Sequence, residues 1–282
     1  MKRKRIYIAY TGGTIGMKKS IRGYIPAEGF LTETVVNNAE FNREEMPLFD
    51  IHEYCPLIDS SDMSPMHWQQ IADDIKAKYA DYDGFVVLHG TDTMAYTASA
   101  LSFMLENLTK PVIVTGSQIP LSQLRSDGQV NLLNAMYLAA NYPIGEVSLY
   151  FNNQLYRGNR ATKMHADGFA AFGSPNMSPL AKVGINIELV AGQLSPSLNN
   201  KLDVTKITPQ QIAVLHLYPG ISVDLIKSMM TDSLKALVLL SFGVGNAPQN
   251  PEMLELFSSA TQAGLVIINL TQCIQGSVNM GG

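Results

Sequence analysis

A turn rich in glycine and threonine, TGGTIG at residues 11–16, is the first stretch of the chain that could carry chemistry. It follows the apolar, β-prone run 6–10, which predicts a buried strand that feeds a tight turn. Glycines allow backbone N–H groups to approach a ligand closely, and a hydroxyl such as that of Thr14 becomes a nucleophile when a base activates it. The turn could therefore hold either a phosphate or a reacting carbonyl.

The phosphate interpretation fits the sequence poorly. Thr11 stands where the dinucleotide fingerprint has its first glycine, and the turn lacks the Gly-Lys-Ser/Thr of a P-loop. The Rossmann pattern also requires a second strand that ends in an acidic residue, whereas residues 21–35 are polar and turn-like. A purely structural turn, whose glycines only let a strand pack closely on a helix, is the other alternative.

Hydroxyl side chains also follow two further apolar runs. Thr91 and Asp92 come directly after the predicted strand 84–90, and Ser117 ends the predicted strand 111–117. Serine and threonine are common helix N-caps, so each hydroxyl alone could be structural. Because ligands bind at the carboxyl ends of parallel strands, the three junctions together predict a site that includes a carboxylate.

The elements that must position these residues alternate between strand and helix. Continuous apolar strands that alternate with helices predict a parallel sheet covered on both faces. We therefore predict an α/β fold with a larger N-terminal domain, residues 1–185, whose mostly parallel sheet is flanked by helices. The expected strands are 84–90, 111–117 and 146–153, and the expected helices are 92–108 and 127–142.

The pattern changes in the polar, irregular segment 186–210, which contains two prolines and predicts a linker. The alternation then resumes in residues 211–282 and predicts a smaller C-terminal α/β domain. Its expected strands are 212–219, 235–243 and 264–272, and its expected helices are 222–230 and 250–263.

Composition restricts the partners and the compartment. Apolar residues make up 46% and charged residues 16%, which is typical of a globular protein with a sizeable core. The net charge is −4, and basic residues cluster only in the first five positions, so we expect no nucleic-acid partner. No apolar run approaches the length of a membrane span, and the start MKRKRIYIAY lacks a signal cleavage site, so we expect a cytoplasmic protein without a membrane partner. Cys55 and Cys273 are expected to be free thiols.

Several segments resemble the bacterial asparaginase family, most closely its cytoplasmic type I branch. YTGGTIGM at 10–17 and VVLHGTDTMAYTASALSFML at 86–105 match the two family signatures, and YRGNRATKMHADGFAAFGSPN at 156–176 matches the segment of the catalytic lysine. LSFGVGNAP at 240–248 and TQCIQGSVNMGG at 271–282 match the second domain. The resemblance spans the chain and implies two α/β domains, the larger one first, in a homodimer or homotetramer.

The resemblance implies that Thr14 attacks the side-chain amide of L-asparagine. A β-aspartyl ester forms, ammonia leaves, and water then releases L-aspartate. Thr91, Asp92 and Lys163 carry over as the second part of the machinery. A lysine with its ordinary pKa of about 10.4 is a poor base at neutral pH, so a neighbouring hydroxyl and carboxylate would have to assist it. Tyr24 carries over from the mobile loop that closes over the nucleophile.

The segment IDSSDMSP at 58–65 matches the part of the family that binds the substrate carboxylate. Without the family, its Asp and Ser residues would be read as a capped turn. His89 is expected to pack at a strand end, and His165 has no second ligand at metal spacing, so we predict neither a metal nor a cofactor. The expected substrate-binding residues are Asp59, Ser60, Ser61, Thr91, Asp92 and Ser117.

Some type I enzymes bind a second asparagine in the smaller domain as an activator. The matching positions here are Thr162, Leu240, Ser241, Phe242, Thr271 and Cys273. An arginine often precedes the serine in the family, and Leu240 takes its place here, which should weaken a carboxylate contact. The sequence therefore leaves both a functional and a non-functional second site open.

Three further points stay open in the sequence. Asparagine and glutamine differ by one methylene, so the preferred substrate is not determined. A non-catalytic amino-acid sensor on the same fold is the alternative function, although such a sensor would not need the intact Thr14. Family members usually continue beyond VNMGG at 278–282, so we expect a truncated or partly given chain with an incomplete smaller domain. If these residues were the complete polypeptide, low stability, weakened oligomerisation and poor activity would be expected.

Overall fold

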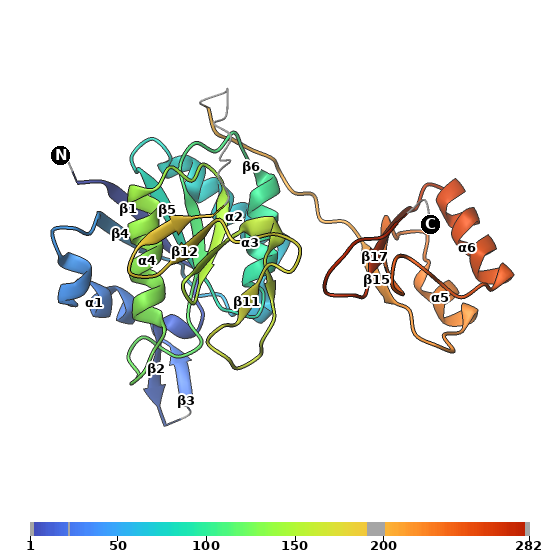
Figure 1. Ribbon diagram of the computed structural model, residues 1–282, viewed down its shortest axis with the longest axis horizontal. Coiled ribbons are helices and arrows are strands. Elements are labelled where there is room, and N and C mark those ends of the chain that lie inside the picture. The colour runs from blue at the N-terminus through green and yellow to red at the C-terminus, as the bar shows by residue number, and fades with distance from the viewer. Residues whose placement is uncertain (1–2, 22, 191–200, 280–282) are drawn as a thin grey trace. The chain divides into compact units, whose positions relative to one another are not determined.

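Five strands of the N-terminal part form the parallel portion of an eight-stranded sheet (Figure 1). From one edge to the other, the strands are β13 (Ile187–Leu189), β12 (Ala181–Val183), β9 (Gln154–Arg157), β8 (Val147–Phe151), β7 (Val112–Thr115), β5 (Gly84–Leu88), β1 (Arg5–Tyr10) and β4 (Leu48–Glu53). The strands from β4 to β8 pair in parallel, whereas β9, β12 and β13 continue the sheet in antiparallel pairs. The strands β5, β7 and β8 are buried along their whole length, as strands covered on both faces must be.

The structure, a computed structural model, describes residues 3–21, 23–190 and 201–279. It divides into two units, residues 1–207 and residues 208–282. Both are built of strands and helices, and the larger one has the mostly parallel sheet. The predicted fold class is therefore confirmed.

Helices cover both faces of the large sheet, because alternate strand residues point to opposite sides. On one face, Tyr7 and Ala9 of β1 pack in a core cluster with apolar residues of α2 (Pro65–Lys78) and α3 (Met94–Met104). On the other face, Ile6 and Ile8 pack in a second core cluster with apolar residues of α1 (Phe30–Val36) and α4 (Gly128–Asn141). This arrangement fixes the strand ends that carry the candidate residues.

Two expectations about local structure need correction. The helix expected at 92–108 begins at Met94 and ends at Met104, because the next two residues form the short strand β6 (Leu105–Glu106) and Asn107 has a φ of 62°. The strand β6 pairs with β14 (Asp203–Val204). The sequence predicts a linker at 186–210, but the strands β13 and β14 of this segment belong to the first unit, which ends at residue 207. Residues 191–200 of this segment lie outside the described residues.

The second unit contains a parallel sheet of three strands, β15 (Ile212–His216), β16 (Ala236–Ser241) and β17 (Val266–Thr271). Its helices are α5 (Val223–Met229) and α6 (Pro251–Gln262). Leu215, Leu237 and Leu239 pack with Ile226 and Met253 of these helices in a small core. Within the described part of the chain, no helix is both long enough and apolar enough to cross a membrane.

Candidate active site

The carboxyl ends of β1, β5 and β7 lie at one edge of the sheet, because these strands are parallel neighbours. Glycines allow the turns beyond them to meet. A Cβ on Gly13 would lie 2.4 Å from the Gly90 nitrogen, and a Cβ on Gly90 would lie 2.4 Å from Ser60 Oγ. Gly13 also has a φ of 95°, which residues with a side chain rarely adopt. The turns after β1 and β5 and the segment after β4 therefore come together only because glycines stand at the contacts.

Thr14 follows Gly13 and begins a short 3-10 turn, Thr14–Gly16, beyond β1. Its side chain is partly exposed, whereas Ile15 and Gly16 are buried. No residue in the described ranges forms a hydrogen bond with the Thr14 hydroxyl. The buried neighbours thus hold Thr14 in place, and its hydroxyl can meet a ligand.

The structure brings Lys163, Thr91 and Asp92 together. Lys163 ends β10 (Thr162–Lys163), which pairs with β11 (Phe172–Gly173). Its Nζ donates to Thr91 Oγ1 at 3.1 Å and lies 2.7 Å from Asp92 Oδ1. The Lys163 side chain is 21% exposed and that of Asp92 is 66% exposed, so solvent reaches this pair mainly at the carboxylate. The attraction of Asp92 holds the ammonium next to a buried hydroxyl.

A further polar residue, Gln118, contacts Thr91, although the sequence analysis does not assign it a role. The Thr91 hydroxyl donates to Gln118 Oε1 at 3.0 Å. The sequence offered one signal, since Gln118 follows Ser117 in the turn after β7, at the same edge of the sheet as Thr91.

The predicted carboxylate-binding segment forms a capped turn next to Gly90. Asp59 accepts hydrogen bonds from the Ser61 hydroxyl at 2.6 Å and from the Ser61 N–H at 2.9 Å, and these bonds lower the pKa of Asp59. Ser60 is 5% exposed, and its carbonyl accepts a hydrogen bond from the Thr93 hydroxyl at 2.6 Å. Ser60 thus lies at the junction with β5, whereas Asp59 and Ser61 are exposed beside it.

Ser117 and Tyr24, which the sequence analysis also assigns to the site, lie near it without a hydrogen bond to Thr91, Asp92 or Lys163 in the described part of the chain. Ser117 is buried at the end of β7, and its hydroxyl donates to the Ile119 carbonyl at 2.6 Å. Tyr24 lies on a hairpin of β2 (Met17–Ser20) and β3 (Gly23–Pro26), where it is 41% exposed. The Cα atoms of β3 come within 8 Å of those of the Thr14–Gly16 turn. The hairpin therefore lies beside Thr14.

His89 is buried beneath the same edge, as expected for a packed residue. Thr97 Oγ1 lies 2.7 Å from His89 Nε2 and accepts a hydrogen bond from Trp68 Nε1 at 2.9 Å. The His89 Nδ1–H donates to the Gly90 carbonyl at 2.7 Å. Burial lowers the pKa of His89 to about 4, so the imidazole is neutral near pH 7 and its unprotonated Nε2 accepts from the Thr97 hydroxyl.

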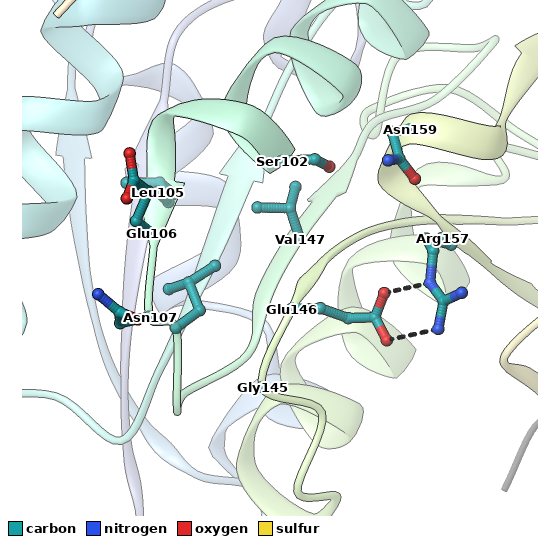
Figure 2. A pocket seen from close by; sticks show the side chains of 10 residues that line it. Ser102, Leu105, Glu106, Asn107, Gly145, Glu146, Val147, Arg157 and Asn159 are labelled. Carbon is teal, nitrogen blue, oxygen red and sulfur yellow. Dashed lines mark hydrogen bonds and ion pairs between the residues drawn. The ribbon is translucent and has the colours of Figure 1, made fainter. Parts of the chain in front are cut away.

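Two surface pockets differ in whether candidate site residues line them. One, of about 460 Å³, is lined by Asp92 and Lys163 together with Tyr96 and Ser99. The other, of about 480 Å³, surrounds the ion pair between Arg157 and Glu146, whose charges already satisfy each other (Figure 2). Among the described residues, no group of three or more His, Cys, Asp or Glu could hold a metal ion. The first pocket shares Asp92 and Lys163 with the candidate site, whereas the second shares none of its residues.

The positions expected for a second asparagine site fall in both units. Ser241 and Phe242 follow one another at the end of β16, and Ser241 Oγ donates to Asn269 Oδ1 at 2.6 Å. Thr271 ends β17, and its Oγ1 accepts a hydrogen bond from the Cys273 N–H at 3.1 Å. Leu240 also lies on β16 and leaves this group without a cation, whereas Thr162 lies on β10 of the first unit. Cys55 and Cys273 are free and exposed, as predicted.

Two protein-family models match this chain, one in its N-terminal part and one in its C-terminal part. The model described as "Asparaginase, N-terminal" matches residues 5–194, and the model described as "Glutaminase/Asparaginase C-terminal domain" matches residues 211–282. The chain belongs to the asparaginase family. The resemblance predicted from the signatures is thereby confirmed.

Individual asparaginases match over nearly the whole chain. The chain is 63% identical to L-asparaginase 1 of Escherichia coli (strain K12), over all of this chain and 83% of that protein. The crystal structure of L-asparaginase I from Vibrio cholerae O1 biovar eltor str. N16961 matches with a TM-score of 0.94 and 61% identity, over 99% of this chain and 84% of that one. A structure of a probable cytoplasmic L-asparaginase from Campylobacter jejuni matches with a TM-score of 0.82 and 25% identity, over 99% of this chain and 86% of that one.

Proposed function

We propose that this chain hydrolyses L-asparagine to L-aspartate and ammonia, with Thr14 as the nucleophile. The observation that carries the proposal is the contact of Lys163 with both Thr91 and Asp92, at the sheet edge where the glycine turn presents Thr14. The full-length similarity to proteins named L-asparaginase supports the substrate.

The reaction balances in two steps. In the first, a bond forms between Thr14 Oγ and the amide carbon, the carbon–nitrogen bond breaks, and the departing nitrogen gains the hydroxyl proton and leaves as ammonia. In the second, water adds to the ester, the bond to Thr14 breaks, and Thr14 regains a proton. Lys163 and Thr91 are the groups positioned to assist these proton transfers, and Asp92 compensates the lysine charge.

Backbone N–H groups at the glycine turn support stabilisation of the oxyanion that develops on the amide carbonyl. Asp92 and the segment Asp59–Ser61 supply groups for the ammonium and the carboxylate of the substrate. The buried Ser60 is held by Gly90 and Thr93, so it is the member of that segment with a fixed position.

Ammonia release from L-asparagine by the parent chain and by Thr14→Ala tests the proposal. The parent should release ammonia, and the variant should not, while it still binds the substrate. Intact-mass spectra of the parent, quenched during turnover, should show an aspartyl adduct on Thr14. An adduct on Thr91 instead would reverse the assigned roles, and the same assay with L-glutamine would define the preferred amide.

A non-catalytic sensor is not favoured, because the nucleophile, the lysine and the carboxylate are all present and Lys163 contacts its partners. The structure named as a probable cytoplasmic asparaginase supports a cytoplasmic location. We also infer a homodimer or homotetramer. Its support is the outer face of α3, where Tyr96 and Phe103 are both 68% exposed on a helix without any charged residue.

The second asparagine site remains a proposal for the carboxyl ends of β16 and β17. Thr271, Cys273 and Ser241 supply polar groups there, but Leu240 cannot bind a carboxylate. If this site binds asparagine, its affinity should be weaker than in a relative with arginine at this position.

A further inference from the structure

Gln118 bridges two parts of the candidate active site. Its Oε1 accepts a hydrogen bond from the Thr91 hydroxyl at 3.0 Å. Its Nε2 donates to the carbonyl oxygens of Ala166 and Gly168, at 3.2 Å and 3.1 Å. Both carbonyls lie in the loop that follows Lys163. One amide group thus holds Thr91 and the loop next to its lysine partner.

The hydrogen-bonding chemistry of these groups allows only one arrangement of protons. The Lys163 ammonium only donates, so the Thr91 oxygen accepts from it. The single hydroxyl proton of Thr91 is then donated to Gln118 Oε1, which only accepts. The amide NH₂ of Gln118 is directed at two carbonyls, which also only accept, so the amide cannot be flipped. One lone pair of the Thr91 oxygen is left for a third partner.

A carboxylate outside the site holds Gln118 in this position. The backbone N–H groups of Gln118 and Ile119 donate to Asp127 at 3.0–3.1 Å. Asn131 Nδ2 donates to the same carboxylate at 3.2 Å and to the Gly116 carbonyl at 3.0 Å. The turn after β7 is therefore tied to the first turns of α4, so the Gln118 side chain starts from a fixed backbone.

We propose that Gln118 is a positioning residue that takes the Thr91 proton and so presents the remaining Thr91 lone pair to the reacting molecule. This inference rests on the proposed function. In ester hydrolysis the attacking water must be oriented toward the carbonyl carbon, and an oxygen that only accepts can orient it by receiving one of its hydrogen bonds. Without Gln118, the Thr91 hydroxyl can turn its proton toward the water and lose this preference.

Two substitutions separate the acceptor from the donors of Gln118. Gln118→Met has a similar length and removes both functions, whereas Gln118→Glu keeps acceptor oxygens for Thr91 and removes the NH₂ donors. We expect Gln118→Met to lower kcat about tenfold with KM changed less than about threefold, because the interaction acts on the chemical step. Gln118→Glu should recover part of this kcat although its Tm is no higher than that of Gln118→Met.

Gln69→Met is the matched control. The Gln69 Oε1 accepts a hydrogen bond from the Ile207 N–H at 3.0 Å, so this glutamine also bridges two segments of the first unit, and it lies on α2. Its kcat should equal that of the parent. A parent-like kcat in Gln118→Met, or a kcat that follows Tm equally in all three variants, would overturn the proposal.

Neutron structures of the two Gln118 variants, which locate hydroxyl protons, keep this test separate from the proposed function. If the parent releases no ammonia from L-asparagine, the proposed function fails, but the positioning claim still predicts that the Thr91 proton points toward residue 118 in Gln118→Glu and away from it in Gln118→Met. The same proton direction in both structures contradicts the claim. If Gln118→Met does not fold, a Thr91 proton directed away from residue 118 in Gln118→Glu contradicts the claim, and one directed toward it with a displaced 166–168 loop supports it.

Discussion

Lys163 illustrates how a single side chain gains a function from its contacts. A lysine is usually exposed, but this one is 21% exposed and is held between the Thr91 hydroxyl and the Asp92 carboxylate. Lys76 forms an ion pair of similar length with Asp203, at 3.0 Å, yet both of those side chains are well exposed and no candidate residue is near them in sequence. The two lysines therefore provide a direct comparison between an ion pair in the candidate site and a surface ion pair.

We predict that Lys163→Met and Asp92→Ala each lower kcat for L-asparagine by at least about 100-fold, the scale of a lost acid–base group. Lys163→Met should affect kcat more than KM, because its contacts are to Thr91 and Asp92. Asp92→Ala should affect both constants, because we propose that this carboxylate also binds the ammonium of the substrate. Lys76→Met is the control and should retain the parent kcat. A near-normal rate in either test variant would remove that residue from the mechanism.

The buried His89 predicts a loss of stability in acid. Burial lowers the pKa of His89 to about 4, whereas the unfolded chain binds this proton near pH 6.5. The associated stability is fully present above pH 6.5 and is lost as the pH falls toward 4, by at most about 3 kcal/mol. Urea unfolding followed by Trp68, the only tryptophan, should show this decline between pH 7 and pH 5.

His89→Gln provides the comparison for this titration. The variant should be less stable than the parent at pH 7, because its hydrogen bonds with Thr97 and Gly90 are altered. Its stability should nevertheless decline less between pH 7 and pH 5. Equal slopes in the two proteins would show that other groups control the acid sensitivity.

At the scale of elements, the glycine contacts decide whether the strand ends can meet. Gly13 and Gly23 have nearly the same φ, 95° and 93°, but a Cβ on Gly13 would strike the Gly90 backbone, whereas a Cβ on Gly23 would meet nothing within 4 Å. We predict that Gly13→Ala lowers the free energy of unfolding by at least about 1 kcal/mol more than Gly23→Ala does. Urea unfolding of the two variants measures the difference. Equal losses would mean that the φ angle alone, and not the close approach, requires glycine at position 13.

The parallel strands could be predicted because burial on both faces gives them continuous apolar runs, as in 84–88 and 112–115. The helix α2 is absent from the prediction although its signals were present: Ser64 precedes Pro65, and Ile71 and Ile75 are spaced for one buried face. The strand β4 is also absent, since its edge position leaves it only partly buried.

The sequence analysis predicted the candidate residues that belong to long motifs, and it missed those that are recognised only by their contacts in the structure. Thr14, Thr91 and Lys163 stand in specific signatures. Gln118 stands in a polar turn without periodicity, and Asp127 stands at the start of the expected helix 127–142. No sequence pattern therefore indicates that Gln118 accepts the hydrogen bond of the Thr91 hydroxyl or that Asp127 holds the backbone of the turn. Helix propensity also could not predict the end of α3. The helix ends where β6 begins, and β6 forms by pairing with β14, almost 100 positions away in the sequence.

At the scale of the whole molecule, the second unit contrasts with the first in how its sheet is covered. The core of the second unit lies between its sheet and the helices α5 and α6. On the opposite face, the register places Val214 and Ile268 on either side of Val238. Val214 is 60% exposed and Ile268 is 46% exposed. Neighbouring exposed side chains of this kind form a contiguous apolar surface, which single exposed residues do not.

This apolar face predicts self-association of the chain as it stands. We expect the parent to bind a hydrophobic dye and to show a weight-average mass that rises with concentration in sedimentation velocity. The double substitution Val214→Lys with Ile268→Lys should lower both signals, with a change in unfolding free energy within about 0.5 kcal/mol per site, because the side chains are exposed.

Leu225→Lys is the control: Leu225 is 44% exposed on α5, away from the sheet face, and its replacement should leave both signals unchanged. If the double variant and the control behave alike, the association must arise on another surface, and the outer face of α3 around Tyr96 and Phe103 becomes the one to test, with Phe103→Glu as the first substitution.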